Sequence, residues 1–249
     1  MKLHYYLIIL LVLFINLSAE IEWDDIKNVT NEYGVSDEQD ITNDGDNYYL
    51  VWNQWGDIQF KKSTNAGQNW SNSVVIYTGF DYGGNYPVIA KSNNRINIVF
   101  YRNTTGNSEI FYSYSDDEGD SFSTPVQITD AIRGAQVPQV IADGDNIWVA
   151  YEDRDEDWNY NIFLIKSSNN GESWSEPVNI SDTTQGARWC SIDHHNGNLV
   201  AVWNEQTGGD YNDLDLYFSS SDDEGETWNT PINITNNQAY NARLTTVLY

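Results

Sequence analysis

A four-fold internal repeat constrains the fold of this chain more than any other sequence feature. Each copy holds a serine, an Asp or Asn two residues later, a glycine four residues later and an aromatic residue seven residues later. The glycines recur at intervals of 52, 52 and 54 residues. The four copies are Ser63, Asn65, Gly67 and Trp70; Ser115, Asp117, Gly119 and Phe122; Ser167, Asn169, Gly171 and Trp174; and Ser221, Asp223, Gly225 and Trp228.

Short runs rich in β-branched and aromatic residues surround each copy of this motif. Around the third copy they are Ile147–Tyr151, Ile162–Ile165 and Pro177–Ser181, and no segment after the N-terminal apolar run shows helical periodicity. About four strands in a repeat of roughly 50 residues are typical of a β-propeller blade. The sequence therefore predicts an all-β propeller with four recognisable four-stranded blades.

The motif itself predicts a tight turn. The Ser and Asp or Asn oxygens accept hydrogen bonds from backbone N–H groups, the glycine tolerates positive φ, and the aromatic ring fills the gap between sheets. This pattern resembles the Asp-box, or BNR repeat, of sialidase-like β-propellers, over nearly the whole chain after its leader. In that family the motif lies between the third and fourth strands of a blade, away from the active centre. The resemblance therefore implies a fold and no chemistry.

The first 19 residues predict a signal peptide. Lys2 precedes an apolar run, Tyr5–Ile15, and a small residue, Ala19, follows at a plausible cleavage point. The run is shorter than the about 20 residues that span a bilayer, although an uncleaved membrane anchor is the alternative. We therefore expect a secreted or cell-surface protein with no membrane span after cleavage.

The propeller domain is expected to occupy residues 20–249. Residues 236–249 resemble the start of a further blade, so the ring is expected to be incomplete, or closed by both termini or by another subunit. An open ring exposes strand edges that favour association with other chains. The repeats are roughly 31–79, 80–130, 131–182 and 183–235.

Composition excludes several functions. With 37 acidic and 12 basic residues the net charge is −25, which excludes a general affinity for nucleic acid. One Cys and three His argue against a disulfide framework and a zinc site. No cofactor is predicted. The Asp-rich loops 153–157 and 210–215 could bind Ca²⁺, but neither has the spacing of a known calcium loop.

Candidate ligand-binding residues gather on one face. If strands run from the axis outwards, the connections from second to third and from fourth to first strands share this side, here called the loop face. Arg188 and Arg243 begin equivalent innermost strands, and Arg133 lies three residues ahead of that position. Their guanidinium groups could hold a carboxylate, or could pair with acidic neighbours such as Glu205. Exposed Trp158 and Tyr211 could stack on a sugar ring.

Carboxylates on the same face are candidates for catalysis. Asp57, Asp153 and Glu205 could supply the acid pair of a glycosidase, or could be ordinary loop charges. The resemblance implies that a true sialidase has an Arg-Ile-Pro element, three inward Arg and a Tyr nucleophile. This chain has no Arg-Ile-Pro, and the Tyr would fall beyond Tyr249 or be missing. No catalytic role is carried over.

The sequence therefore predicts a propeller that binds a carbohydrate or a surface protein on the loop face without catalysis. Two alternatives remain at this point. One is an exo-sialidase or related glycoside hydrolase, and the other is a structural module of a larger surface protein whose open edge pairs with another chain.

Overall fold

The computed structural model describes residues 26–30, 36–79, 84–104, 106–208 and 213–235. The chain divides into two units, Met1–Asn31 and Glu32–Tyr249, and all the described strands belong to the second. The regular structure in these ranges is β throughout. Among the described residues, none lies in a helix long and apolar enough to cross a membrane.

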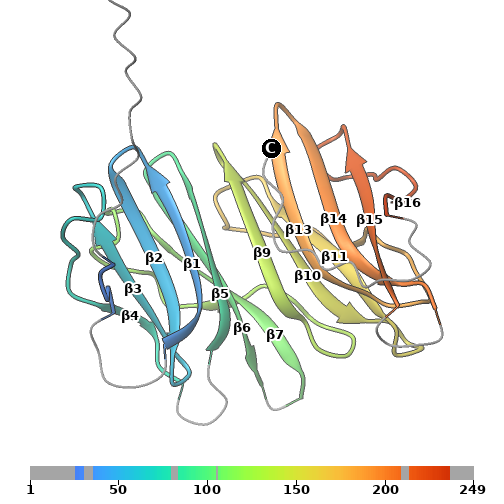
Figure 1. Cartoon of the computed structure of the whole chain (residues 1–249), viewed down its shortest axis with the longest axis horizontal. Coiled ribbons are helices and arrows are strands. Elements are labelled where there is room, and N and C mark those ends of the chain that lie inside the picture. Colours follow the sequence, from blue (N-terminus) through green and yellow to red (C-terminus); the bar gives the residue numbers. More distant parts are fainter. Residues whose placement is uncertain (1–25, 31–35, 80–83, 105, 209–212, 236–249) are drawn as a thin grey trace, which may run out of the picture. The chain divides into compact units, whose positions relative to one another are not determined.

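The strands form four antiparallel sheets of four, each built from four consecutive strands (Figure 1). These sheets are blades 1 to 4 of a β-propeller, so the predicted fold is confirmed. Blade 1 comprises β1 (Ser36–Asp44), β2 (Asn47–Gln54), β3 (Asp57–Ser63) and β4 (Val74–Tyr77). Blade 2 comprises β5 (Gly84–Ser92), β6 (Arg95–Asn103), β7 (Ser108–Ser115) and β8 (Val126–Gln127). Blade 3 comprises β9 (Gln136–Asp143), β10 (Asn146–Arg154), β11 (Tyr160–Ser167) and β12 (Val178–Asn179), and blade 4 comprises β13 (Ala187–His195), β14 (Asn198–Gln206), β15 (Leu214–Ser221) and β16 (Ile232–Asn233).

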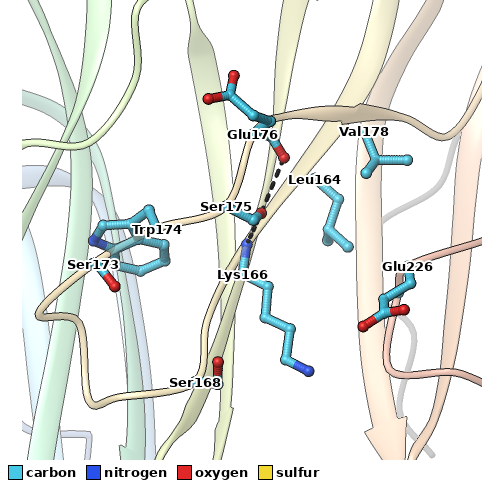
Figure 2. A pocket seen from close by; sticks show the side chains of 10 residues that line it. Leu164, Lys166, Ser168, Ser173, Trp174, Ser175, Glu176, Val178 and Glu226 are labelled. Atoms are coloured by element: carbon cyan, nitrogen blue, oxygen red, sulfur yellow. Dashed lines mark hydrogen bonds between the residues drawn. The ribbon is translucent and has the colours of Figure 1, made fainter.

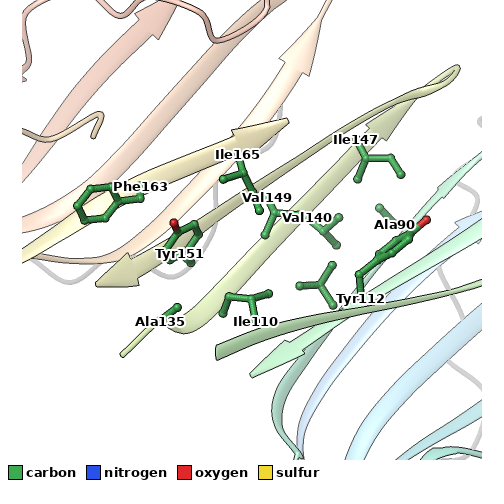
Figure 3. Close-up of a cluster of buried hydrophobic side chains, with 11 residues drawn as sticks. Ala90, Ile110, Tyr112, Ala135, Val140, Ile147, Val149, Tyr151, Phe163 and Ile165 are labelled. Atoms are coloured by element: carbon green, nitrogen blue, oxygen red, sulfur yellow. The ribbon is translucent and has the colours of Figure 1, made fainter. Parts of the chain in front are cut away.

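The hydrophobic core consists of three layers, one at each junction between consecutive blades. Alternate residues of a strand point to opposite faces of its sheet, so a blade buries apolar side chains against both neighbours. Figure 3 shows the layer between blades 2 and 3, where Ile110 and Tyr112 of β7 lie against Val140 and Val149 of blade 3. The blades are therefore held together by side-chain packing between sheets.

The repeated motif forms the turn after the third strand of each blade. In blade 2, Ser115 Oγ accepts a bond from Gly119 N (2.8 Å) and donates to Asp117 Oδ1 (2.7 Å). Asp117 Oδ1 also accepts from Ser121 N (2.9 Å). The same three bonds recur in the other three copies. These turns, together with the turns between first and second strands, define the box face.

The repeated turns also connect neighbouring blades. The Phe122 ring packs edge-on against Phe60 of the preceding blade, with ring centroids 4.9 Å apart. In the next turn Trp174 packs in the same way against Tyr112, at 5.4 Å. The motif thus fixes both a turn and a blade junction.

Every innermost strand has a β-bulge close to the loop face. The residue that enters the bulge has positive φ although it is not glycine. Such conformations are strained and persist only where the surroundings hold them. The four bulge residues are Glu38, Tyr86, Val137 and Trp189.

Candidate functional site on the loop face of blades 3 and 4

A pocket of about 150 Å³ opens on the loop face between blades 3 and 4. The β10–β11 connection supplies Trp158, which is 59% exposed, and β11 begins with Tyr160. Blade 4 supplies Arg188 and the bulge residue Trp189 from the start of β13. The pocket therefore combines three aromatic rings with a guanidinium group.

Arginine side chains and aromatic rings stack alternately, some of them lining this pocket and others next to it. Three of the six arginines of the chain take part. Stacking on an aromatic face fixes a guanidinium group and is favourable in itself, so three positive charges are gathered here. We call this set the Arg–aromatic ladder, with centroid distances of 4.4 Å for Arg133–Trp158, 5.8 Å for Arg154–Trp158, 4.3 Å for Arg154–Tyr160, 4.2 Å for Arg188–Tyr160 and 4.9 Å for Arg188–Trp189.

Glu152 lies beneath the ladder and is 1% exposed. Its Oε2 accepts a bond from Arg188 Nε (3.1 Å), and its Oε1 accepts one from Trp189 N (2.6 Å). Burial raises the pKa of Glu152, and the Arg188 charge opposes this rise. Arg188 thus forms an ion pair with Glu152, and the same carboxylate holds the strained backbone of Trp189.

The predicted catalytic carboxylates accept hydrogen bonds from loop residues and, in the case of Glu205, also from a buried strand residue. Asp153 Oδ2 accepts from Ile132 N (2.8 Å), and its Oδ1 accepts from Arg133 N (3.0 Å). Glu205 Oε1 accepts from Thr183 Oγ1 (2.5 Å) and its Oε2 from Trp203 Nε1 (3.1 Å). Asp57 Oδ1 accepts from Gly79 N (2.9 Å). Within the described ranges, none of these three carboxylates lines the pocket.

Asp57 shares its role with the residues at its position in the other repeats. Each of them lies close to the start of a third strand and bonds to the chain that leaves the fourth strand. Glu109 Oε2 accepts from Ala131 N (3.1 Å), Asn161 Oδ1 from Thr183 N (3.0 Å), and Asp215 Oδ1 from Thr235 Oγ1 (2.9 Å). This position therefore anchors a loop in every blade.

Two predicted ligand residues, Arg243 and Tyr211, lie outside the described residues, as does part of the loop 210–215. In the other Asp-rich loop, Asp155 Oδ1 accepts from Asn159 N (2.9 Å). Across the described ranges, no three His, Cys, Asp or Glu side chains are grouped as metal ligands.

The sequence interpretation missed Glu152, Arg154, Tyr160 and Trp189 as site residues. The register of the hairpin formed by β10 and β11 could have identified Arg154 and Tyr160 as a contacting pair, because it places them opposite each other. No sequence signal marks Glu152, since its partners lie on β13, in the next blade.

The same fold occurs in several solved structures. A thermostable family-43 glycoside hydrolase matches with a TM-score of 0.57 and 14% identity, over 87% of this chain and 78% of the other. A protein of unknown function from Dyadobacter fermentans matches with a TM-score of 0.64 and 12% identity, over 86% and 71%. The GH93 α-L-arabinofuranosidase of Fusarium graminearum, in complex with arabinobiose, matches at 0.57 and 13%, over 76% and 63%.

At these identities the likeness establishes the fold and no activity. The fold is that of β-propeller glycoside hydrolases. No protein-family model matches the sequence. No curated protein matches it either.

Proposed function

We propose that this chain is a secreted β-propeller that binds an acidic carbohydrate at the Arg–aromatic ladder without catalysing a reaction. The observation that carries the proposal is that Arg133, Arg154 and Arg188 stack on aromatic rings, one of them the exposed Trp158, in a chain of net charge −25. A sugar acid needs this combination, because its ring stacks on an aromatic face while its carboxylate pairs with guanidinium groups.

The fold neighbours support a carbohydrate as the ligand, since one of them is described in complex with arabinobiose. The bonding of Asp57, Asp153 and Glu205 supports the proposed lack of catalysis, because each of them holds a loop or a buried group. Hydrolysis is the second candidate function, because other neighbours are glycoside hydrolases. Incubation with fluorogenic sialosides and arabinosides separates the two, and only hydrolysis releases the fluorophore.

A glycan array followed by titration calorimetry tests the proposal. We expect wild type to bind sialylated or uronic-acid glycans, and Trp158→Ala to weaken the binding about tenfold. Trp55→Ala is the matched control. Trp55 is 70% exposed, has positive φ as Trp158 does, and occupies the corresponding connection of blade 1, outside the pocket.

Arg133→Gln gives a second test that leaves the buried Glu152 pair intact. The Arg133 side chain stacks on Trp158 and donates a long bond, 3.5 Å, from Nη2 to Glu156 O. We expect weaker binding of acidic glycans and a smaller salt dependence of the affinity. The proposal fails if no acidic glycan binds, or if Trp158→Ala and Trp55→Ala bind equally well.

A further inference from the structure

The basic side chains near the box face have carboxylate partners. In the described part of the chain, four cations there each form an ion pair with an acidic residue in or beside one of the turns of that face. Lys166, for example, lies at the junction of blades 3 and 4 (Figure 2). The pairs are Lys62–Asp120, Lys91–Asp44, Arg95–Asp116 and Lys166–Glu224. The charges of these four cations are therefore balanced where they lie.

Two arginines of the Arg–aromatic ladder lack such a partner. Within the described ranges, no carboxylate forms an ion pair with Arg133 or Arg154. Their Nη2 groups donate to neutral acceptors, the Glu156 carbonyl for Arg133 and the Tyr160 hydroxyl for Arg154. The third ladder arginine is paired with a buried glutamate. The ladder therefore carries two positive charges that no ion pair balances.

Acidic residues are close in sequence, on the loop that carries Trp158. Asp155 Oδ1 accepts a bond from the backbone N–H of Asn159 (2.9 Å), within the same loop. Glu156 and Asp157 are exposed, and water and salt weaken the interactions of exposed charges. These carboxylates therefore reduce the attraction of the ladder for an anion without forming an ion pair with it.

The two unpaired arginines lie over the same ring. The centroid of the Trp158 indole is 4.4 Å from Arg133 Cζ and 5.8 Å from Arg154 Cζ. Like charges gathered in this way repel each other. A ligand with one carboxylate leaves one arginine without a partner, because bidentate pairing matches one carboxylate to one guanidinium group. A ligand with two acidic groups satisfies both arginines.

We propose that the ladder binds an oligosaccharide with acidic groups on two successive sugar units, one unit held by Arg133 and the other by Arg154. The proposal rests on the function proposed above, and it narrows the ligand from any acidic carbohydrate to an oligomer of sugar acids. Such an oligomer is favoured over a small dianion, because its charges are spaced along a chain while the two arginines are spread over an indole ring.

Titration calorimetry with three galacturonic acid probes tests the proposal. The probes are the monomer, the dimer and the fully methyl-esterified dimer, which is neutral. At low salt we expect wild type to bind the dimer roughly tenfold more tightly than the monomer, because the dimer adds a second charge-assisted bond. The ester should bind about tenfold more weakly than the acidic dimer. Added salt should weaken binding of the dimer more steeply than binding of the monomer.

Variants of the two arginines locate the effect. Arg133→Gln and Arg154→Gln should each lower the affinity for the dimer to that of the monomer. The affinity for the monomer should fall by about twofold, because the remaining arginine still pairs with its carboxylate. Arg95→Gln is the matched control, since Arg95 also stacks on a ring, 4.0 Å from the Tyr114 centroid, but pairs with Asp116 near the box face. This control should bind all three probes as wild type does.

The outcomes separate this proposal from the proposed function. Equal affinity for monomer and dimer, or an undiminished preference for the dimer in both variants, would overturn the proposal and leave the proposed function intact. Inorganic sulfate that displaces the dimer as effectively as unlabelled dimer does would overturn it too, because a small dianion would then fill the site. If neither acidic probe binds wild type, the proposal is overturned, and the glycan array decides the proposed function alone. If thermal unfolding shows that Arg154→Gln does not fold, Arg133→Gln decides the test.

Discussion

The two faces of the propeller differ in how much of their structure is repeated from blade to blade. On the box face one set of hydrogen bonds recurs in all four blades, with Ser115, Asp117 and Gly119 as its pattern. On the loop face the connections differ from blade to blade, and the ladder with its buried Glu152 belongs to blades 3 and 4. The repeated bonds serve what every blade needs in order to fold, and the unrepeated connections are where we propose that a ligand binds.

Backbone strain follows the same division. On the box face, Glu118 has φ of +55° and is followed by a glycine, so the turn is held by its own short-range bonds. On the loop face, Trp189 has φ of +53° and its N–H is bound by Glu152 of the preceding blade. The strained residue on this face is thus held from the neighbouring blade, as it also is in blade 2, where Tyr86 N donates to Glu38 Oε2 of blade 1 (2.8 Å).

The largest expected loss of folding stability is for a glycine substitution on the box face. In Gly119→Ala the new Cβ would lie 2.4 Å from Phe60 Cε1, and φ is +83°. We expect a loss of about 1–2 kcal/mol from the backbone conformation and about 1–3 kcal/mol from overpacking. Gly197→Ala is the control, because its φ is +84° and nothing lies within 4 Å. Urea unfolding should show the loss from overpacking only in Gly119→Ala, whereas both variants should show the loss from the backbone conformation. Equal losses of stability in the two variants would mean that this blade junction is not tightly packed.

The second-largest loss of stability is expected when Arg188 is removed. Arg188→Ala leaves Glu152 as a buried carboxylate without its ion-pair partner, which costs about 3 kcal/mol. On the box face, Asp116 pairs with Arg95 Nε at 2.7 Å but is 56% exposed, so Asp116→Ala should cost less than about 1 kcal/mol. Chemical denaturation of both variants makes the comparison. A loss for Arg188→Ala no larger than that for Asp116→Ala would show that this loop-face pair is not structural.

The two faces should also respond to pH with opposite sign. Burial raises the pKa of Glu152, so the folded state holds this proton more tightly than the unfolded chain does. The stability contributed by Glu152 is therefore full below the usual glutamate pKa of about 4.3 and falls as pH rises towards the raised value. Unfolding measured from pH 4 to 8 should show wild type losing stability relative to Glu152→Gln as pH increases. The same pH dependence in both proteins would exclude this titration.

The smallest effect is expected for Asp117→Asn on the box face. The Ser121 hydroxyl, then its N–H, lowers the pKa of Asp117 to about 2, so its contribution is present above the usual aspartate pKa and is lost as pH falls. Blade 3 already has Asn169 here, whose Nδ2 donates to Ser173 Oγ (2.8 Å). The variant should be slightly less stable than wild type at pH 7, because it lacks this contribution, and should lose less stability in acid. A large loss at pH 7 would show that the two kinds of motif are not equivalent.

The sequence predicted the box face well because its bonds join residues four positions apart, as in Ser115 and Gly119. It also placed the strands of each blade, since every sheet uses consecutive strands. The loop face was predicted less well. Arg188, Arg133 and Trp158 were identified as candidates, but the partner of Arg188 is 36 residues away on another blade. Such a pair depends on how sheets pack, which no local pattern encodes.

The central claim is that the unrepeated loop face of blades 3 and 4 is where an acidic carbohydrate binds. The most direct measurement is a crystal structure of the full chain with the acidic glycan selected on the array. The sugar ring should lie against Trp158, with its carboxylate turned towards the Arg–aromatic ladder. An acidic sugar bound instead on the box face, with the ladder unoccupied, would contradict this account.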